Sequence, residues 1–234
     1  MTPLAHVDAL DSLRLEANAG VYEPMETAWL RQHLKPGQTF LDVGAHVGYY
    51  TTMAAAIVGP AGAVYAFEPD PENFRLLVLN LEAADAGNTT AYNFAVSDRE
   101  GTASLYRSRV NTGDHHLYPA GRKRAITVNV MTLDTLRLPR PADFLKIDVQ
   151  GLELHVLRGA RGTIDRAPNL KGIIECGPQH QRLAGTDPRD LLAFLTDRGF
   201  RLEIAHRGRI IPAPIEAIPS WARHTNLLIT REGQ

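Results

Sequence analysis

The sequence predicts a single α/β domain built on a mostly parallel sheet. Its 234 residues are about right for one α/β domain, at roughly 150 residues per domain. Hydrophobic residues make up 44% and charged residues 22%, which argues against disordered, collagen-like and membrane-bundle classes. From Thr39 onward, short runs of branched apolar residues alternate with segments of helical period, and this alternation is typical of βαβ units.

The alternation gives seven candidate strands for the main sheet. They are the runs 39–43, 63–67, 89–96, 144–148, 172–175, 201–205 and 226–230. Helices are expected between them, and Asp70-Pro71 and Asp187-Pro188 each offer a capping carboxylate followed by a proline in the first helical position. The runs 102–106 and 125–130 are strand-like with no helix between them, so they predict an inserted β-hairpin with a long basic connection.

The charge balance and the composition argue against nucleic acid and membranes as partners. Lys and Arg total 25 against 26 Asp and Glu, so no net positive field would hold the chain on nucleic acid or on an anionic membrane. The first twenty residues lack the apolar core of a secretory signal, and no apolar run is long enough to cross a bilayer. The single cysteine, Cys176, fits a reducing compartment, so the expected location is cytoplasmic.

The first two strands end in residues suited to a nucleoside ligand. The first ends in Asp42-Val43-Gly44-Ala45-His46-Val47-Gly48, where glycines allow a tight turn and the close approach of a ligand. Glu68 ends the second strand, twenty residues after Gly48, where an acid can accept hydrogen bonds from ribose hydroxyls. A purely structural interpretation, with two turn glycines and a helix-capping acid, also fits this spacing.

The glycine spacing separates two cofactor classes. A dinucleotide site is typified by G-x-G-x-x-G, whereas Gly44 and Gly48 form G-x-x-x-G with Tyr49 directly behind, which leaves little room for a pyrophosphate. Asp42 would neutralise the ammonium of a methionine moiety. The pattern therefore favours S-adenosylmethionine, with S-adenosylhomocysteine as its product.

Six segments occur in order along the chain, namely residues 40–51 (FLDVGAHVGYYT), 67–71 (FEPDP), 93–98 (NFAVSD), 111–115 (NTGDH), 131–136 (MTLDTL) and 144–151 (FLKIDVQG). Together they resemble the FkbM family of S-adenosylmethionine-dependent methyltransferases, and the resemblance runs from about residue 20 to 177. It implies the Rossmann-like class I methyltransferase fold, a seven-stranded mostly parallel sheet with helices on both faces. It also implies methylation of hydroxyls on natural products and saccharides. Gln150 departs from the family, in which glutamate is usual.

The resemblance also implies a set of cofactor contacts. Asp42, Gly44, Ala45 and Gly48 would surround the methionine moiety, Glu68 would bind the ribose, and Pro69 would lie near the adenine. Ala95 and Val96, at the end of the third strand, would wall the adenine, while Tyr22 and Glu23 would close over the cofactor. It divides the single domain into an entry segment (1–38), a cofactor half (39–98), a hairpin with an acceptor loop (99–135) and the rest of the sheet (136–234).

Transfer to a hydroxyl is helped by a base that takes its proton. Asp148, at the end of a strand, and His115 in the inserted loop are the predicted catalytic residues, and His116 is a weaker alternative. Asp148, Glu175 and His180 could hold Mg²⁺, but their scattered spacing does not favour a metal. Cys176 is interpreted as a core residue.

The leading hypothesis is an O-methyltransferase acting on a small molecule, natural product or saccharide. An NAD-dependent oxidoreductase and a non-catalytic adenosyl-binding module are the alternatives, and N-methylation stays open because nothing in the sequence fixes the acceptor atom.

Overall fold

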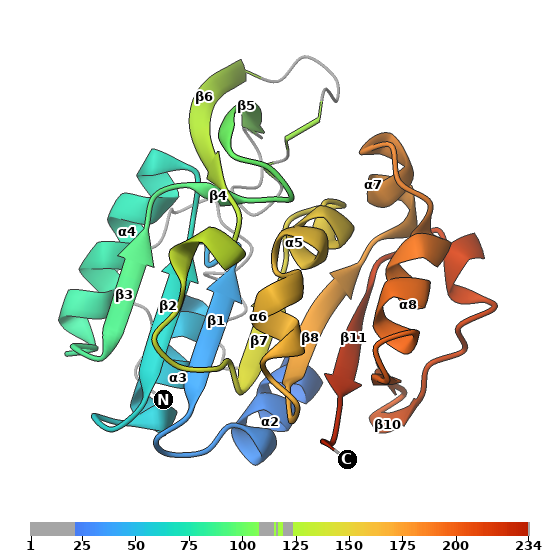
Figure 1. The fold of residues 1–234 in the computed structure, drawn as a ribbon, viewed down its shortest axis with the longest axis horizontal. Coiled ribbons are helices and arrows are strands. Elements are labelled where there is room, and N and C mark those ends of the chain that lie inside the picture. The colour runs from blue at the N-terminus through green and yellow to red at the C-terminus, as the bar shows by residue number, and fades with distance from the viewer. Residues whose placement is uncertain (1–21, 108–114, 116, 119–123, 234) are drawn as a thin grey trace.

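In this computed structural model the chain is an α/β fold with two sheets, described over residues 22–107, 115, 117–118 and 124–233. The large sheet has eight strands in the order β10-β9-β11-β8-β7-β1-β2-β3 (Figure 1). Its strands are β1 (Thr39–Val43), β2 (Ala63–Phe67), β3 (Thr89–Tyr92), β7 (Phe144–Ile147), β8 (Lys171–Cys176), β9 (Arg201–His206), β10 (Arg209–Pro212) and β11 (Thr225–Thr230).

The expected seven strands are therefore one too few. β10 was missed because it lies in a proline-rich connection and ends in Pro212. A proline cannot donate to a ladder, but β10 is the edge strand and pairs only with β9. Strands β3, β2, β1, β7 and β8 are mutually parallel, whereas β11 is antiparallel to both β8 and β9.

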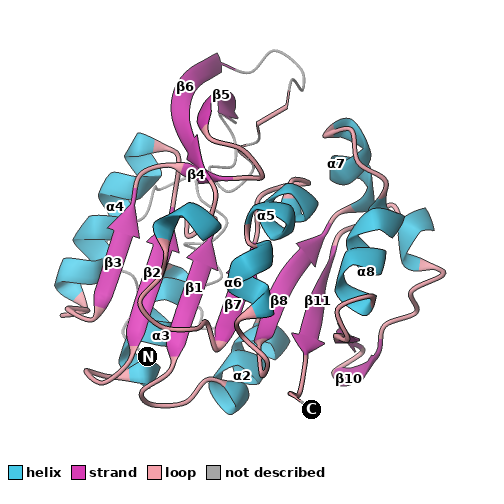
Figure 2. Cartoon of the chain, in the orientation of Figure 1, coloured by secondary structure: helices cyan, strands magenta, loops and turns pink. Residues whose placement is uncertain are grey.

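Helices cover both faces of this sheet (Figure 2). One face carries α2 (Pro24–His33), α3 (Tyr49–Val58) and α4 (Pro71–Ala83), and the other carries α5 (Glu153–Gly159), α6 (Arg161–Asp165) and α8 (Pro188–Thr196). The predicted caps are confirmed, because the Asp70 carboxylate accepts from the backbone N–H of Glu72 and Asn73 and the Asp187 carboxylate accepts from that of Arg189. Short α7 (Pro178–Leu183) follows β8.

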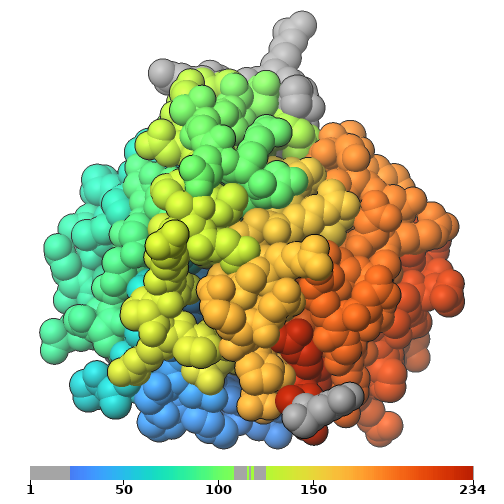
Figure 3. All heavy atoms as spheres, in the orientation of Figure 1, coloured from blue at the N-terminus to red at the C-terminus, as the bar shows by residue number. Residues whose placement is uncertain are grey.

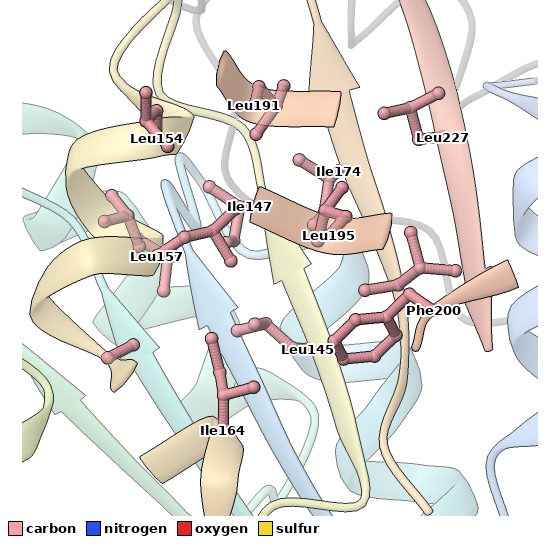
Figure 4. Close-up of a cluster of buried hydrophobic side chains, with 14 of the residues drawn as sticks. Leu145, Ile147, Leu154, Leu157, Ile164, Ile174, Leu191, Leu195, Phe200 and Leu227 are labelled. Carbon is pink, nitrogen blue, oxygen red and sulfur yellow. The ribbon is translucent and has the colours of Figure 1, made fainter. Parts of the chain in front are cut away.

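The larger core lies between the sheet and the second helix layer. Figure 4 shows leucine and isoleucine side chains of β7, β8 and β11 packed against those of α5, α6 and α8. Leu145, Ile147, Ile174, Leu195 and Leu227 are at most 1% exposed. Removing one buried leucine of this kind costs about 2 to 5 kcal/mol, so this core fixes the strands whose ends carry the site.

The predicted hairpin is confirmed as β5 (Gly101–Arg107) paired antiparallel with β6 (Arg124–Met131). It belongs to a separate three-stranded sheet in the order β4-β6-β5, which stands above the body of the molecule (Figure 3). The expected strand 89–96 is wrong in extent. It breaks after Tyr92, and β4 (Ala95–Val96) pairs with β6 instead of with β2.

The strand order reverses between β1 and β7, since the chain builds outward to β3 on one side and to β8 on the other. In open parallel sheets a ligand binds beyond the carboxyl ends of the strands at such a point. The predicted site residues Asp42 and Asp148 lie at the carboxyl ends of these two strands.

Candidate active site

Asp42 is the buried acid of the candidate cofactor site. It lies in β1 and is 1% exposed. Its Oδ2 accepts a hydrogen bond of 2.6 Å from the Thr51 hydroxyl, but its Oδ1 has no partner among the described residues. Burial raises the pKa of this carboxyl, and the charge of Lys146 opposes that rise. An unpaired carboxylate oxygen at a strand end fits a ligand carrying an ammonium group.

The glycines of the following turn are required by packing. Gly44 and Gly48 have φ angles of 83° and 93°, a region that disfavours other residues. A Cβ on Gly44 would lie 1.9 Å from the Asp148 carbonyl oxygen, and one on Gly48 would lie 2.6 Å from a methyl of Leu77. The predicted tight turn is confirmed. The atoms that exclude a side chain at Gly44 and Gly48 belong to Asp148 and Leu77. The N–H groups of Gly44 and Ala45 both donate to the carbonyl oxygen of Phe67, which locks this turn to β2.

Glu68 follows β2 and faces the same turn. Its Oε2 accepts from the His46 N–H and its Oε1 from the Asp70 N–H, both at 2.9 Å. The side chain is 5% exposed, and burial raises its pKa to about 8. The Asn73 side chain is a further hydrogen-bond donor to this carboxyl, and the acceptor capacity that remains could take a ribose hydroxyl. Pro69 follows it, and the Asn93 side chain donates to the carbonyl oxygens of both Glu68 and Pro69.

The small sheet is tied to the cofactor half through Asp70. Arg107, the last residue of β5, places its Nε 2.6 Å from Asp70 Oδ2 and its Nη2 2.6 Å from Glu72 Oε2. His115 lies in the same place, with its Nε2 3.6 Å from Asp70 Oδ2. The structure therefore puts His115 near the end of β2, whereas Asp148 lies at the end of β7. His116 and the basic residues of the connection at 108–114 and 119–123 lie outside the described residues.

Asp148 belongs to a cluster of ionisable groups at the ends of β7 and β8. The Lys146 ammonium lies 3.0 Å from its Oδ2, and this charge holds the pKa of Asp148 low although burial opposes it. The Gln150 side-chain amide donates to Asp148 Oδ1 and to Glu175 Oε2, each at 3.0 Å. Burial and the neighbouring carboxylates raise the pKa of Glu175 well above its usual range. One amide thus joins two carboxyl groups of opposite character.

Tyr22 and Glu23 border this cluster. The Glu23 carboxylate accepts from the Tyr50 hydroxyl at 2.6 Å and from the Asn226 side chain at 2.9 Å. The Tyr22 ring packs edge-on against Tyr49, with ring centroids 5.1 Å apart. Both predicted entry residues are therefore held beside the carboxyl ends of the strands by the first turn of α3.

Ala95 and Val96 are placed differently from the expectation. They form β4 and pair with Val130 and Met131 of β6, so they belong to the small sheet and not to the end of β3. They are 4% and 3% exposed. Asn93 and Phe94 separate them from β3.

Three further residues belong to this site and are not among the predicted ones, namely Lys146, Tyr50 and Asn226. A signal existed for Lys146, since a lysine inside the apolar run 144–147 of a central strand needs a buried partner. Nothing in the sequence marks Asn226, which reaches the site only because β11 pairs with β8 and sets it opposite Glu175. Among the described residues, no group of three His, Cys, Asp or Glu side chains is arranged to hold a metal ion.

The sheet order and strand-end acids define a class I methyltransferase fold. The match to the FkbM methyltransferase domain covers residues 42–202, and the chain belongs to this family. It is 28% identical over 173 residues to the hexuronic acid methyltransferase AglP of Haloferax volcanii, covering 72% of this chain and 65% of that protein. The chain thus spans just under two thirds of this relative.

Solved structures share the fold at low identity. The FkbM methyltransferase of Methylobacillus flagellatus KT gives a TM-score of 0.55 at 17% identity, covering 95% of this chain and 55% of that one. A protein from Streptococcus mutans described as a methyltransferase, solved with S-adenosylhomocysteine, gives 0.53 at 10% identity and covers 89% and 97%. No helix of the described part of the chain is long and apolar enough to span a bilayer.

Proposed function

We propose that this methyltransferase transfers a methyl group from S-adenosylmethionine to a hydroxyl oxygen of a saccharide or similar small molecule. The observation that carries the proposal is Asp42, a buried carboxylate with one unpaired oxygen at the strand reversal of an FkbM-family fold. Bound at this point, the cofactor supplies a methyl group already activated by its sulfonium.

The chain's own residues would bind the cofactor and orient it toward the acceptor. Asp42 would hold the ammonium, Glu68 the ribose hydroxyls, and the Gly44–Gly48 turn would position both, with Pro69, Ala95 and Val96 around the adenine. Tyr22 and Glu23, fixed by Tyr49 and Tyr50, would cover the methionine end. Holding the acceptor oxygen in line with the methyl group is the largest contribution a protein can make to this displacement.

A cavity beyond β8 supports an acidic saccharide as the acceptor. It has a volume of about 390 Å³ and is lined by Gly177, Gln179, His180, Ala222, Arg223 and His224. These residues continue β8 and precede β11, whose paired ends carry Glu175 and Asn226. The lining includes an arginine and two histidines but no carboxylate, so it suits a carboxylate-bearing sugar. The relative named as a hexuronic acid methyltransferase supports the same class of acceptor. A net charge of −1 supports neither nucleic acid nor a membrane surface as the partner.

The proposal is tested by measuring S-adenosylhomocysteine formation with glucuronic acid and with glucose, which lacks the carboxylate. We expect turnover with glucuronic acid and little with glucose. Mild alkali then identifies the methylated atom, because a methyl ester releases methanol and a methyl ether does not. An alkali-stable product is expected, and methanol release would show methylation of the carboxylate instead.

A further inference from the structure

We propose that Glu175 is the catalytic base, taking the proton of the acceptor hydroxyl, and that Gln150 is the residue that positions it. The inference rests on the proposed function and goes beyond it by naming the base. The sequence instead predicts Asp148 and His115 as the catalytic residues. It is carried by the arrangement of four side chains at the ends of β7 and β8, namely Lys146, Asp148, Gln150 and Glu175.

The geometry separates the two carboxyl groups. Asp148 is engaged on both oxygens, by the Lys146 ammonium at 3.0 Å and by the Gln150 amide at 3.0 Å. A carboxylate paired with a buried ammonium is stabilised in its charged form and is therefore a weak proton acceptor. Asp148 is better suited to act as a fixed negative charge that holds Lys146 and Gln150 in place.

Glu175 has the opposite surroundings. It is 7% exposed, and only its Oε2 is occupied, by the same Gln150 amide at 3.0 Å. Within the described part of the chain, the hydrogen bond made by the Glu175 carboxyl is this one, to Oε2. The cavity that would take the acceptor begins at Gly177, two residues further along the chain. Glu175 therefore combines an orientation fixed by Gln150 with a position two residues before the first residue that lines the cavity.

The charges around Glu175 set its proton affinity. Asp148, Glu153 and Glu23 face it and disfavour its ionised form, while Lys146 favours it, and burial raises the pKa furthest. The Tyr50 hydroxyl and the Asn226 amide are directed to Glu23. A carboxylate with a raised pKa is a stronger base once ionised, and a sulfonium cation bound nearby would favour that ionised form.

The proposed step is balanced. The acceptor oxygen forms a bond to the methyl carbon as the carbon–sulfur bond breaks, and the hydroxyl proton passes to Glu175 Oε1. The sulfonium becomes the neutral thioether of S-adenosylhomocysteine, and Glu175 returns its proton to solvent before the next turnover.

The test compares Glu175→Gln with Glu153→Gln, a matched change at a buried carboxyl bound instead to the Gly151 N–H at 2.8 Å. Each variant is measured for affinity for S-adenosylhomocysteine, for kcat against pH with glucuronic acid as the acceptor, and for thermal stability. Glu175→Gln should lower kcat by about 10²- to 10³-fold, with cofactor affinity within about threefold of wild type. It should also abolish the rise of kcat with pH, whereas Glu153→Gln should retain that rise at lower pH, because it removes a carboxylate that disfavours the ionised form of Glu175.

A second readout does not depend on turnover. The side-chain carboxyl ¹³C signal of Glu175, assigned by its absence from the Glu175→Gln spectrum, should titrate above the ordinary range and at lower pH with S-adenosylmethionine than with S-adenosylhomocysteine. Titration near 4.5, or Glu175→Gln activity within about threefold of wild type, would overturn the assignment. Failure of wild type to bind either adenosyl ligand would instead overturn the proposed function.

Discussion

The buried ammonium of Lys146 lies 3.0 Å from Oδ2 of Asp148, whose side chain is half-buried at the end of β7. Each charge stabilises the other, since the pKa of Lys146 is raised and that of Asp148 is lowered. Asp42 also contributes to the raised pKa of Lys146. One cation therefore stabilises the negative charge shared by the ends of β1 and β7.

Replacing Lys146 by methionine should destabilise the protein by about 3 to 5 kcal/mol, because it leaves the buried Asp42 and the half-buried Asp148 without their counter-charge. The loss should shrink as pH falls and these carboxyls take up protons. Urea unfolding at pH 5 and pH 8 measures both effects. Lys171→Met is the control, since Lys171 is the first residue of β8 and lies at the end of that strand away from the site. Equal losses in the two variants would contradict the role given to Lys146.

Replacing Asp148 by asparagine should slow methyl transfer more than it weakens cofactor binding. The neutral side chain loses its ion pair with Lys146 and has a single oxygen where two now accept from Lys146 and Gln150, so we expect kcat to fall at least about tenfold while affinity for S-adenosylhomocysteine changes less than about threefold. Steady-state kinetics and calorimetry measure the two quantities. Asp143→Asn is the matched control, because Asp143 precedes β7 and accepts a hydrogen bond from the N–H of Thr39, the first residue of β1, at the strand ends away from the site. An unaltered kcat in Asp148→Asn would remove Asp148 from the site.

The raised pKa of Glu68 predicts a pH dependence of stability. The pKa of Glu68 is about 8 in the folded state and 4.5 ordinarily. Between these two pH values the folded state keeps a proton that the unfolded state has released. The free energy of unfolding should therefore fall as pH rises from about 4.5 to 8. Glu68→Gln should reduce this slope, and Glu82→Gln, an exposed change on α4, should keep it. Identical slopes for wild type and Glu68→Gln would contradict the burial of this acid.

The Arg107–Asp70 ion pair predicts that the small sheet and the cofactor half are coupled. Asp70 is fully buried and Arg107 is 27% exposed, so Arg107→Ala removes the guanidinium 2.6 Å from the Asp70 carboxylate and leaves it with His115 at 3.6 Å. We expect a loss of about 1.5 to 3 kcal/mol in the free energy of unfolding and weaker binding of S-adenosylhomocysteine. Arg75→Ala, on the exposed side of α4, is the control. Unchanged cofactor affinity in Arg107→Ala would show that the small sheet and the cofactor half are not coupled through this ion pair.

Much of the fold could be predicted because its signals are local. The Asp70-Pro71 cap, the turn at Gly44 and Gly48, and the alternation of strands and helices all depend on neighbours in the sequence. The break at Asn93 and Phe94 could not be predicted, because β4 leaves the large sheet to pair with β6, a strand that begins at Arg124.

The site divides in the same way. Asp42, Glu68 and Asp148 could be named because they end predicted strands. Their partners could not, since Gln150 is oriented by a positive φ of 52° and Asn226 is brought to Glu23 across 203 residues. The raised pKa of Glu175 depends on burial and on Asp148 and Glu153, which pairing and packing place around it.

The most direct test of the account is a calorimetric titration of the purified protein with S-adenosylmethionine, S-adenosylhomocysteine and NAD in separate runs. We expect micromolar binding of both adenosyl ligands and no binding of NAD. Above pH 8, where Glu68 is ionised, we also expect Glu68→Ala to lose a few kcal/mol of binding free energy, because charge-assisted hydrogen bonds of about 1.5 to 3 kcal/mol each would be lost. Preferential binding of NAD, or unchanged affinity in Glu68→Ala, would contradict the assignment of this strand-end site to an adenosyl cofactor.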